Sequence, residues 1–74
     1  MESAAVKEKI EYTIFLVNDF AKKHALSHSE AFNYLDRFGA IGFIERNYNI
    51  AHTLAFSEMV ENLTAFCRKN GGKL

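Results

Sequence analysis

Apolar residues recur every three or four positions along the first third of the chain, which is the spacing of an amphipathic helix. The repeating positions are Val6, Ile10, Ile14, Val17 and Ala21, and the apolar stripe is widened on one side by Leu16 and Phe20. This pattern predicts a long helix over about residues 4–25. We expect its apolar stripe to face the core of the protein.

A stop and a restart follow in the segment LSHSEAF. Ser27 and Glu30 stand at the spacing of a capping box, in which each side chain accepts a hydrogen bond from the backbone N–H of the other residue. A second helix is therefore predicted over residues 28–38. Gly39 comes next, and glycine readily takes the left-handed conformation that ends a helix.

Two more helices complete the pattern. One is predicted over residues 40–48 and the other over residues 57–69, where Ser57 would cap the first turn. The apolar positions of the last helix are Met59, Val60, Leu63, Phe66 and Cys67. The sequence therefore predicts an all-α fold, a compact bundle of four helices in a single domain over residues 1–74, with a loose tail at residues 71–74.

The two middle helices invite comparison with a helix-turn-helix, in which a short turn containing glycine joins two helices. If Gly39 is the turn glycine, Leu35 occupies the position of the usual small residue, and Glu45 that of a buried apolar residue. Residues 28–52 also carry three acidic and two basic side chains, the wrong sign for a DNA partner. A degenerate helix-turn-helix regulator that binds DNA as a dimer is therefore the alternative function.

The composition favours association with a partner. A chain of 74 residues is marginally stable by burial alone, and small domains are commonly stabilised by disulfides, a metal or association. The single cysteine cannot form an internal disulfide, and His24, His28 and His52 lack neighbours at zinc-ligand spacing. We therefore expect no metal or other cofactor, and association as the remaining source of stability.

The charge and the apolar runs limit the partners and the location. Nine basic and nine acidic side chains give a formal net charge of zero, which argues against a nucleic-acid partner. The longest apolar run, Ile14 to Val17, is far too short to cross a bilayer, and no signal-peptide pattern is present. A lone cysteine fits a reducing compartment. We expect a soluble, cytoplasmic protein with no membrane association.

His52 is the strongest candidate for chemistry. General-base catalysis needs a neighbouring group that orients the histidine and a pocket that holds substrate. The nearest polar neighbours are Tyr48 and Thr53, and neither is a carboxylate. We interpret His52 as an architectural residue at the junction before the last helix. Cys67 lies on an apolar stripe and is predicted to be buried and inert, so we do not expect an enzyme.

The order of several residues resembles a small bacterial family known as domain of unknown function 3791. These residues are Leu26, Glu30-Ala31, Phe38-Gly39, Ile44, Tyr48, His52-Thr53 and Glu61-Asn62-Leu63. The resemblance covers about residues 8–68, and its most specific part is the Tyr-x-x-x-His-Thr motif at Tyr48, His52 and Thr53. Where members tend to have a leucine and an acid, this chain has Ala51 and Asn62.

The resemblance implies a bacterial origin and a short helical domain without an assigned activity. It also implies a neighbouring gene for an ADP-ribosyltransferase-like protein, and hence an antitoxin or accessory role. The expected function is accordingly a non-enzymatic protein-interaction module, which associates with itself or with a partner such as a companion toxin.

The first helix is the expected contact surface. On a helical wheel Phe15 points away from the predicted core stripe and lies near Asp19 and Lys22, with Tyr12 closer to the stripe. Burial of one phenylalanine against a partner contributes about 1.5–3 kcal/mol, which is large beside a marginal total. We therefore expect a homodimer through a two-fold pairing of first helices at Tyr12, Phe15, Asp19 and Lys22.

Overall fold

Five helices make up the described part of the chain. The computed structural model describes residues 2–74, and it describes side chains from Val6 onward. The helices are α1 (Glu2–His24), α2 (His28–Arg37), α3 (Ala40–Arg46), α4 (Tyr48–Ala51) and α5 (Phe56–Lys69). Residues 2–74 contain no strand, so the prediction of an all-α fold is confirmed.

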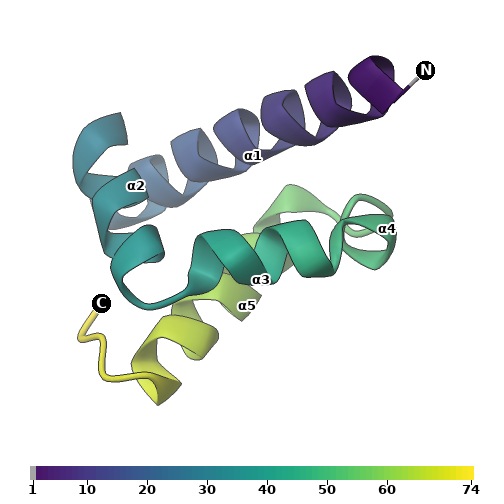
Figure 1. Cartoon of the computed structure of the whole chain (residues 1–74). Coiled ribbons are helices and arrows are strands. Elements are labelled where there is room, and N and C mark those ends of the chain that lie inside the picture. Colours follow the sequence, from purple (N-terminus) through teal and green to yellow (C-terminus); the bar gives the residue numbers. More distant parts are fainter. Residues whose placement is uncertain (1) are drawn as a thin grey trace.

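α1 is the longest element and lies along one side of the molecule (Figure 1). The chain turns back through α2, α3 then runs beneath α1, and α5 packs against both α1 and α3. The core between these helices is made of thirteen buried side chains, namely Leu16, Val17, Phe20, Ala21, Ala31, Leu35, Ala40, Ile44, Ala51, Met59, Val60, Leu63 and Cys67. Every helix therefore contributes to a single core.

The start of α2 has the predicted capping box. The backbone N–H of Glu30 donates to Ser27 Oγ at 3.1 Å, and the backbone N–H of Ser27 donates to Glu30 Oε1 at 2.8 Å. Both bonds of the capping box are thus present at the start of α2. Gly39 follows the end of α2 with a φ of 78°, the left-handed conformation that its position predicted.

The prediction of one helix over residues 40–48 is wrong in detail. α3 ends at Arg46, and a separate single turn, α4, follows. The side-chain amide of Asn47 donates to the carbonyl of Phe43 at 2.9 Å, and the backbone N–H of Asn47 bonds the same oxygen at 3.1 Å. One carbonyl of the last turn of α3 therefore accepts both a backbone and a side-chain hydrogen bond from Asn47, the residue that follows the helix.

The prediction that Ser57 caps the last helix is also wrong. α5 begins at Phe56, and its N-cap is Ala55, which has an extended backbone but no side chain able to cap. Ser57 lies inside the first turn. The helix thus begins one residue earlier than predicted, at Phe56, whose ring lies 5.5 Å from the Tyr12 ring of α1.

The core face of α1 differs most from the prediction. Leu16, Phe20 and their neighbours are buried as expected, but Val6 and Ile10 are each 54% exposed and Ile14 is 45% exposed. α1 has 23 residues, whereas α2 has 10 and α3 has 7. The shorter helices cover the C-terminal half of α1 and leave the apolar stripe of its N-terminal half uncovered.

The C-terminal tail lies against the bundle, which differs from the expected loose tail. The backbone N–H of Leu74 donates to Tyr34 Oη at 3.3 Å, and the Arg68 guanidinium donates to the carbonyl of Leu74. Gly72 approaches Tyr34 so closely that a Cβ at this position would lie 2.0 Å from the Tyr34 hydroxyl oxygen. Glycine at this position therefore allows the tail to pack beside α2.

Candidate functional site

The motif residues Tyr48, His52 and Thr53 close the single turn of α4. His52 Nδ1 lies 2.7 Å from the carbonyl oxygen of Tyr48, and the Thr53 hydroxyl donates to the carbonyl of Ile50 at 2.6 Å. A carbonyl only accepts, so Nδ1 of His52 carries the proton in this arrangement. Two helix-end carbonyls are therefore satisfied by the side chains that follow them.

The His52 ring is exposed and stacks on the Tyr48 ring, with centroids 4.8 Å apart and planes inclined by 16°. The Tyr48 ring also contacts the Tyr12 ring of α1 edge-on, with centroids 5.4 Å apart. His52 thus has an aromatic neighbour and a backbone partner. These contacts support the architectural interpretation of the motif, and a separate functional role of His52 is not needed to explain them.

Tyr12 lies inward and connects α1 to the turn that carries the motif. Its hydroxyl donates to the carbonyl of the buried Ala51 at 3.0 Å, and its ring also contacts Phe56. Burial, and secondarily the neighbouring Tyr48, raise the pKa of Tyr12 above its usual value. The sequence grouped Tyr12 with Phe15 as a subunit contact, but the structure separates the two residues.

Phe15, Asp19 and Lys22 share one outer face of α1. The Phe15 side chain is 57% exposed, as its position on the helical wheel predicted. Asp19 and Lys22 line a shallow hollow of about 380 Å³ against α5, where Val60 and Glu61 form the opposite wall. The hollow has charged side chains on both walls, and the subunit contact expected at this face stays a prediction.

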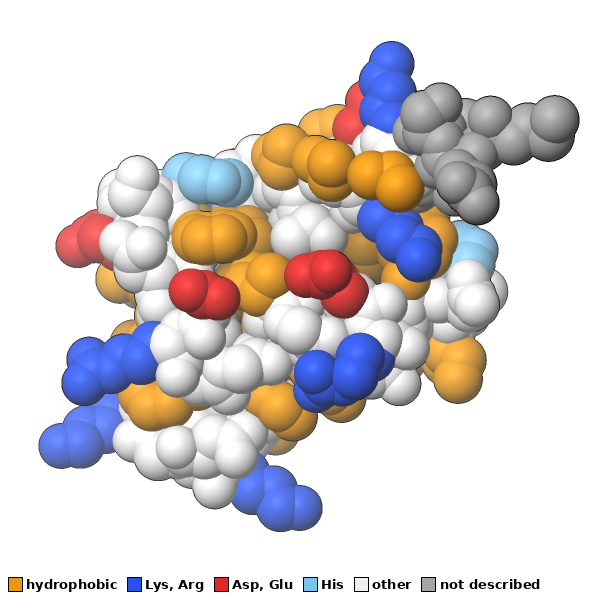
Figure 2. All heavy atoms as spheres, viewed as in Figure 1, with side chains coloured by type: hydrophobic (Ala, Val, Ile, Leu, Met, Phe, Trp, Pro, Cys, Tyr) orange, Lys and Arg blue, Asp and Glu red, His pale blue; other side chains and the backbone are white. Residues whose placement is uncertain are grey.

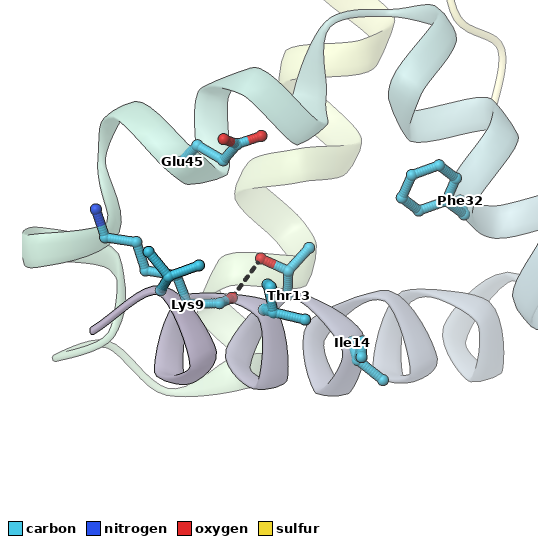
Figure 3. A pocket seen from close by; sticks show the side chains of 7 residues that line it. Lys9, Thr13, Ile14, Phe32 and Glu45 are labelled. Atoms are coloured by element: carbon cyan, nitrogen blue, oxygen red, sulfur yellow. Dashed lines mark hydrogen bonds between the residues drawn. The ribbon is translucent and has the colours of Figure 1, made fainter. Parts of the chain in front are cut away.

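A larger groove lies between α1, α2 and α3 (Figure 3). It has a volume of about 510 Å³ and is lined by Val6, Lys9, Ile10, Thr13, Ile14, Phe32 and Glu45. Phe32 from α2 and Glu45 from α3 face the α1 residues across the hollow. The Thr13 hydroxyl donates to the carbonyl of Lys9 at 2.8 Å, so its proton is used within α1.

The apolar side chains of this groove are exposed to solvent. Val6, Ile10, Ile14 and Phe32 are four of the seven large hydrophobic side chains that the described part of the chain exposes. Figure 2 shows hydrophobic side chains gathered along α1 and below it, with charged side chains around them. We call the surface formed by Val6, Ile10, Ile14 and Phe32 the α1 groove surface.

The half-buried histidine, His24, is held inside a network of neutral hydrogen bonds. The Thr64 hydroxyl donates to the carbonyl of Val60 at 2.9 Å, and its oxygen lies 2.9 Å from His24 Nε2, which therefore donates to it. Burial lowers the pKa of His24, and the positive charges of Lys23 and Arg68 lower it further. This histidine links α1 to α5 through its bond to Thr64.

The remaining polar candidates are also accounted for by neighbours. His28 Nδ1 lies 2.6 Å from Asn18 Oδ1, on a different side of α1 from His24. Cys67 has no exposed surface, and burial raises the pKa of its thiol to about 11, so the prediction of a buried thiol is confirmed. Within the described residues, no group of three or more His, Cys, Asp or Glu side chains is placed to hold a metal.

The structure differs from a helix-turn-helix at the positions that the sequence comparison used. α3 has only seven residues, and Glu45, which stands where a recognition helix buries an apolar side chain, is exposed and lines the α1 groove. Leu35, where a small residue is usual, is fully buried. DNA binding stays a prediction from the sequence.

The comparison with protein families gives one match. The model for proteins of unknown function DUF3791 matches residues 11–70, which is well over half of the chain. The chain belongs to the DUF3791 family. The comparisons with curated proteins and with solved structures gave no match. Among the described residues, no helix is long and apolar enough to cross a membrane.

The DUF3791 match divides the candidate sites. It includes the whole Tyr48, His52 and Thr53 motif, together with Tyr12 and Phe32. It begins after Val6, Lys9 and Ile10, so three of the five residues that α1 gives to the groove precede the matched region. The matched region thus includes the motif and Phe32 and does not include the N-terminal part of the groove.

Phe32 and the groove were missed by the sequence reasoning. The signal that could have found them is the width of the apolar surface of α1, which includes Ile10 and Ile14 as well as Leu16 and Phe20. A stripe much wider than about 100° can serve two contacts, one with the core and one elsewhere. The length of the first predicted helix, about twice that of the others, pointed the same way.

Proposed function

We propose that this DUF3791 protein is a non-enzymatic protein-interaction module that binds through the α1 groove surface. The observation that carries the proposal is the exposure of four large apolar side chains from two helices around one hollow. Val6 and Ile10 are each 54% exposed, Ile14 is 45% exposed and Phe32 is 39% exposed. In a chain this small, exposure of these side chains to water lowers the stability of the fold unless a partner covers them.

The shape of the surface suits a helix as the partner. A groove between packed helices commonly takes an amphipathic helix, which places apolar side chains three or four residues apart into it. The exposed parts of the four side chains amount to roughly 300 Å², which is at the lower end of the range for the largest apolar patch of a monomeric protein, and such patches are often functional. The hollow is long enough, because Val6 and Ile14 are separated by about 12 Å of helix.

The chemistry of the lining favours binding over catalysis. The groove carries one amine at Lys9, one carboxylate at Glu45 and one hydroxyl at Thr13, which already bonds within its helix. General-base catalysis requires an orienting partner for the base, and among the described residues no side chain forms a hydrogen bond with the Glu45 carboxylate. An antitoxin role toward a companion toxin-like enzyme, as the family resemblance implies, is one form of such a module.

Site-specific photo-cross-linking in cells of the native host tests this function. A photoreactive amino acid replaces Ile10 or Ile14 in the groove, and Ile50, which is 68% exposed outside the groove, serves as the matched control. We expect a protein adduct of defined mass from positions 10 and 14 and none from position 50. Absence of an adduct at positions 10 and 14, with the protein folded and abundant, would contradict the function.

A further inference from the structure

We propose that Asn70 is a deamidation site and that its conversion to isoaspartate releases residues 71–74 from α2. The site is the joint at which α5 ends and the C-terminal tail begins, where Asn70 is the C-cap residue. Asn70 and Gly71 are both exposed to solvent. Of the six asparagines in the chain, Asn70 is the only one that a glycine follows.

An asparagine followed by glycine favours deamidation, because glycine has no Cβ to obstruct the approach of its backbone nitrogen. The Gly71 nitrogen gives up its proton to solvent hydroxide and attacks Asn70 Cγ. A new N–C bond closes a five-membered succinimide, and the side-chain nitrogen takes a proton from water and leaves as ammonia. Water then opens the ring, so that the net reaction consumes one water and releases one ammonia.

The succinimide ring opens in two ways. Attack of water at the former side-chain carbonyl gives aspartate on a backbone of normal length. Attack at the backbone carbonyl gives isoaspartate, in which the main chain continues through the former side chain and is longer by one methylene group. The two products carry the same charge and differ in the length of the backbone.

The folded structure protects the pair through the hydrogen bonds that end α5. The backbone N–H of Gly71 donates to the carbonyl of Arg68 at 3.1 Å, and that of Gly72 donates to the carbonyl of Cys67 at 2.7 Å. These are the two bonds of a Schellman motif, and Gly71 has the left-handed backbone that the motif requires, with a φ of 109°. The attacking nitrogen is therefore already bonded to a helix carbonyl.

The Asn70 side chain is held by the same helix end. Its amide nitrogen donates to the carbonyl of Phe66 at 3.0 Å. The backbone of Asn70 has a ψ of 11°, which turns the Gly71 nitrogen away from the Asn70 side chain. Attack on Cγ therefore requires that these bonds break and that the backbone at Asn70 rotates, which is a local opening of the last turn.

The contacts of the tail depend on the geometry of this joint. The backbone N–H of Leu74 donates to Tyr34 Oη at 3.3 Å, and Gly72 lies against the same hydroxyl group. An added methylene group before Gly71 shifts both N–H groups of the Schellman motif, so its two bonds cannot form together. Isoaspartate therefore removes the turn that directs residues 71–74 toward α2.

Timed incubation of the purified chain at neutral pH, folded and in urea, tests the reaction. Cleavage after glutamate yields residues 62–74, which contain Asn62 and Asn70, and fragment masses assign each deamidation. Asn62 is the matched control, because it is also exposed on α5 but is followed by leucine. We expect conversion at Asn70 and none at Asn62, at least about tenfold slower in the folded chain, since the last turn must open first.

Nuclear magnetic resonance of the separated products measures the release of the tail. In the unmodified chain, the α protons of Gly72 should show a nuclear Overhauser contact with the Tyr34 ring, because the two residues touch. The isoaspartate form should lose this contact. Asn70→Asp has the same charge on a normal backbone and should keep the contact, since Arg68 and Lys69 in the last turn offset the charge.

Four results would overturn the proposal. Conversion at Asn70 no faster than at Asn62 would remove the site, and equal rates in the folded and unfolded chains would show that the Schellman motif does not protect it. An isoaspartate form that keeps the contact between Gly72 and Tyr34 would show that the tail is not released. Loss of this contact in Asn70→Asp as well would overturn the assignment of the release to the longer backbone.

Discussion

The two halves of α1 have the same apolar spacing and opposite surroundings. In the C-terminal half, Leu16 and Phe20 have no exposed surface, because α2 and α5 cover them. In the N-terminal half, Val6 and Ile10 are more than half exposed. The comparison teaches that helical periodicity identifies an apolar face but does not identify the neighbour that covers it, whether within the chain or in another molecule.

The two halves of α1 also differ in the hydrogen bonds that connect them to other helices. His24 bonds Thr64 of α5, so the C-terminal half is tied to a second helix at its end. From Val6 onward, the described side chains of the N-terminal half make one such hydrogen bond to another helix, from Tyr12 to Ala51. An isolated helical segment of about ten residues is marginal in water, so the first turns of α1 depend on Tyr12 and on any partner that covers the groove.

The largest expected effect separates the two halves directly. Leu16→Ala should lower the free energy of unfolding by about 2–5 kcal/mol, because it leaves a cavity in the core. Ile14→Ala, two residues earlier and 45% exposed, should lower it by less than about 1 kcal/mol in dilute protein. Urea unfolding at low micromolar concentration measures both. Equal losses for the two variants would show that the halves do not differ as described.

Tyr12→Phe tests the connection that holds the N-terminal half. The change keeps the ring contacts with Tyr48 and Phe56 and removes the hydrogen bond to the carbonyl of Ala51. We expect a loss of about 0.5–1.5 kcal/mol in unfolding free energy, together with faster amide hydrogen exchange in the first turns of α1. Unchanged exchange in those turns would mean that the bond does not fix them.

Ala25→Gly sharpens the comparison at the other end of α1. Ala25 has a φ of 55°, and the backbone N–H of Leu26 donates to the carbonyl of Ala21 at 2.8 Å, the bond of a helix end that favours glycine. The substitution should raise the free energy of unfolding by about 0.5–1 kcal/mol, after the greater freedom of glycine in the unfolded chain is counted. A lower melting temperature for this variant would show that the left-handed backbone of Ala25 is not strained.

The smallest expected effect is a pH dependence that belongs to the C-terminal half. The pKa of His24 is lowered in the folded protein, so the unfolded chain binds the proton more readily. Stability should therefore be full above the ordinary pKa of 6.5 and should fall as the pH decreases through that value toward the folded pKa. Because His24 is partly exposed, solvent screening keeps the loss small.

Thermal melts of the wild type and of His24→Gln across this range provide the measurement. The wild type should lose stability as the pH falls from about 8 to about 5.5, and the variant should lose less. Glu30, whose pKa is lowered by its hydrogen bonds to Ser27, contributes at lower pH, where its carboxylate becomes protonated. An identical pH dependence in wild type and variant would remove His24 as the cause.

Features that depend on neighbouring residues in the sequence were predicted well. The capping box of Ser27 and Glu30 and the left-handed Gly39 follow from local chemistry, and both are present in the structure. The buried position of Cys67 follows from the apolar stripe of α5. The N-cap of α5 was misplaced because serine is a usual capping residue, whereas the structure has Ala55 at this position without a side-chain bond.

The candidate site was predictable only in part. Tyr48 and His52 are four residues apart, so their stacking follows from helical spacing. The groove joins α1 to Phe32 and Glu45, and no local pattern tells that α2 and α3 leave Ile10 uncovered. Coverage depends on the relative lengths and positions of helices, which the apolar pattern of each helix does not contain.

The central claim is that the apolar stripe of α1 is open to a partner at Ile10 and covered by the core at Leu16, and thiol labelling measures this difference directly. Ile10→Cys and Leu16→Cys are each treated with a thiol reagent in the folded protein, in which the native Cys67 thiol is buried. The account predicts that the cysteine at position 10 reacts at the rate of an exposed thiol and that the cysteine at position 16 reacts only on unfolding. Equal rates at the two positions would contradict the account.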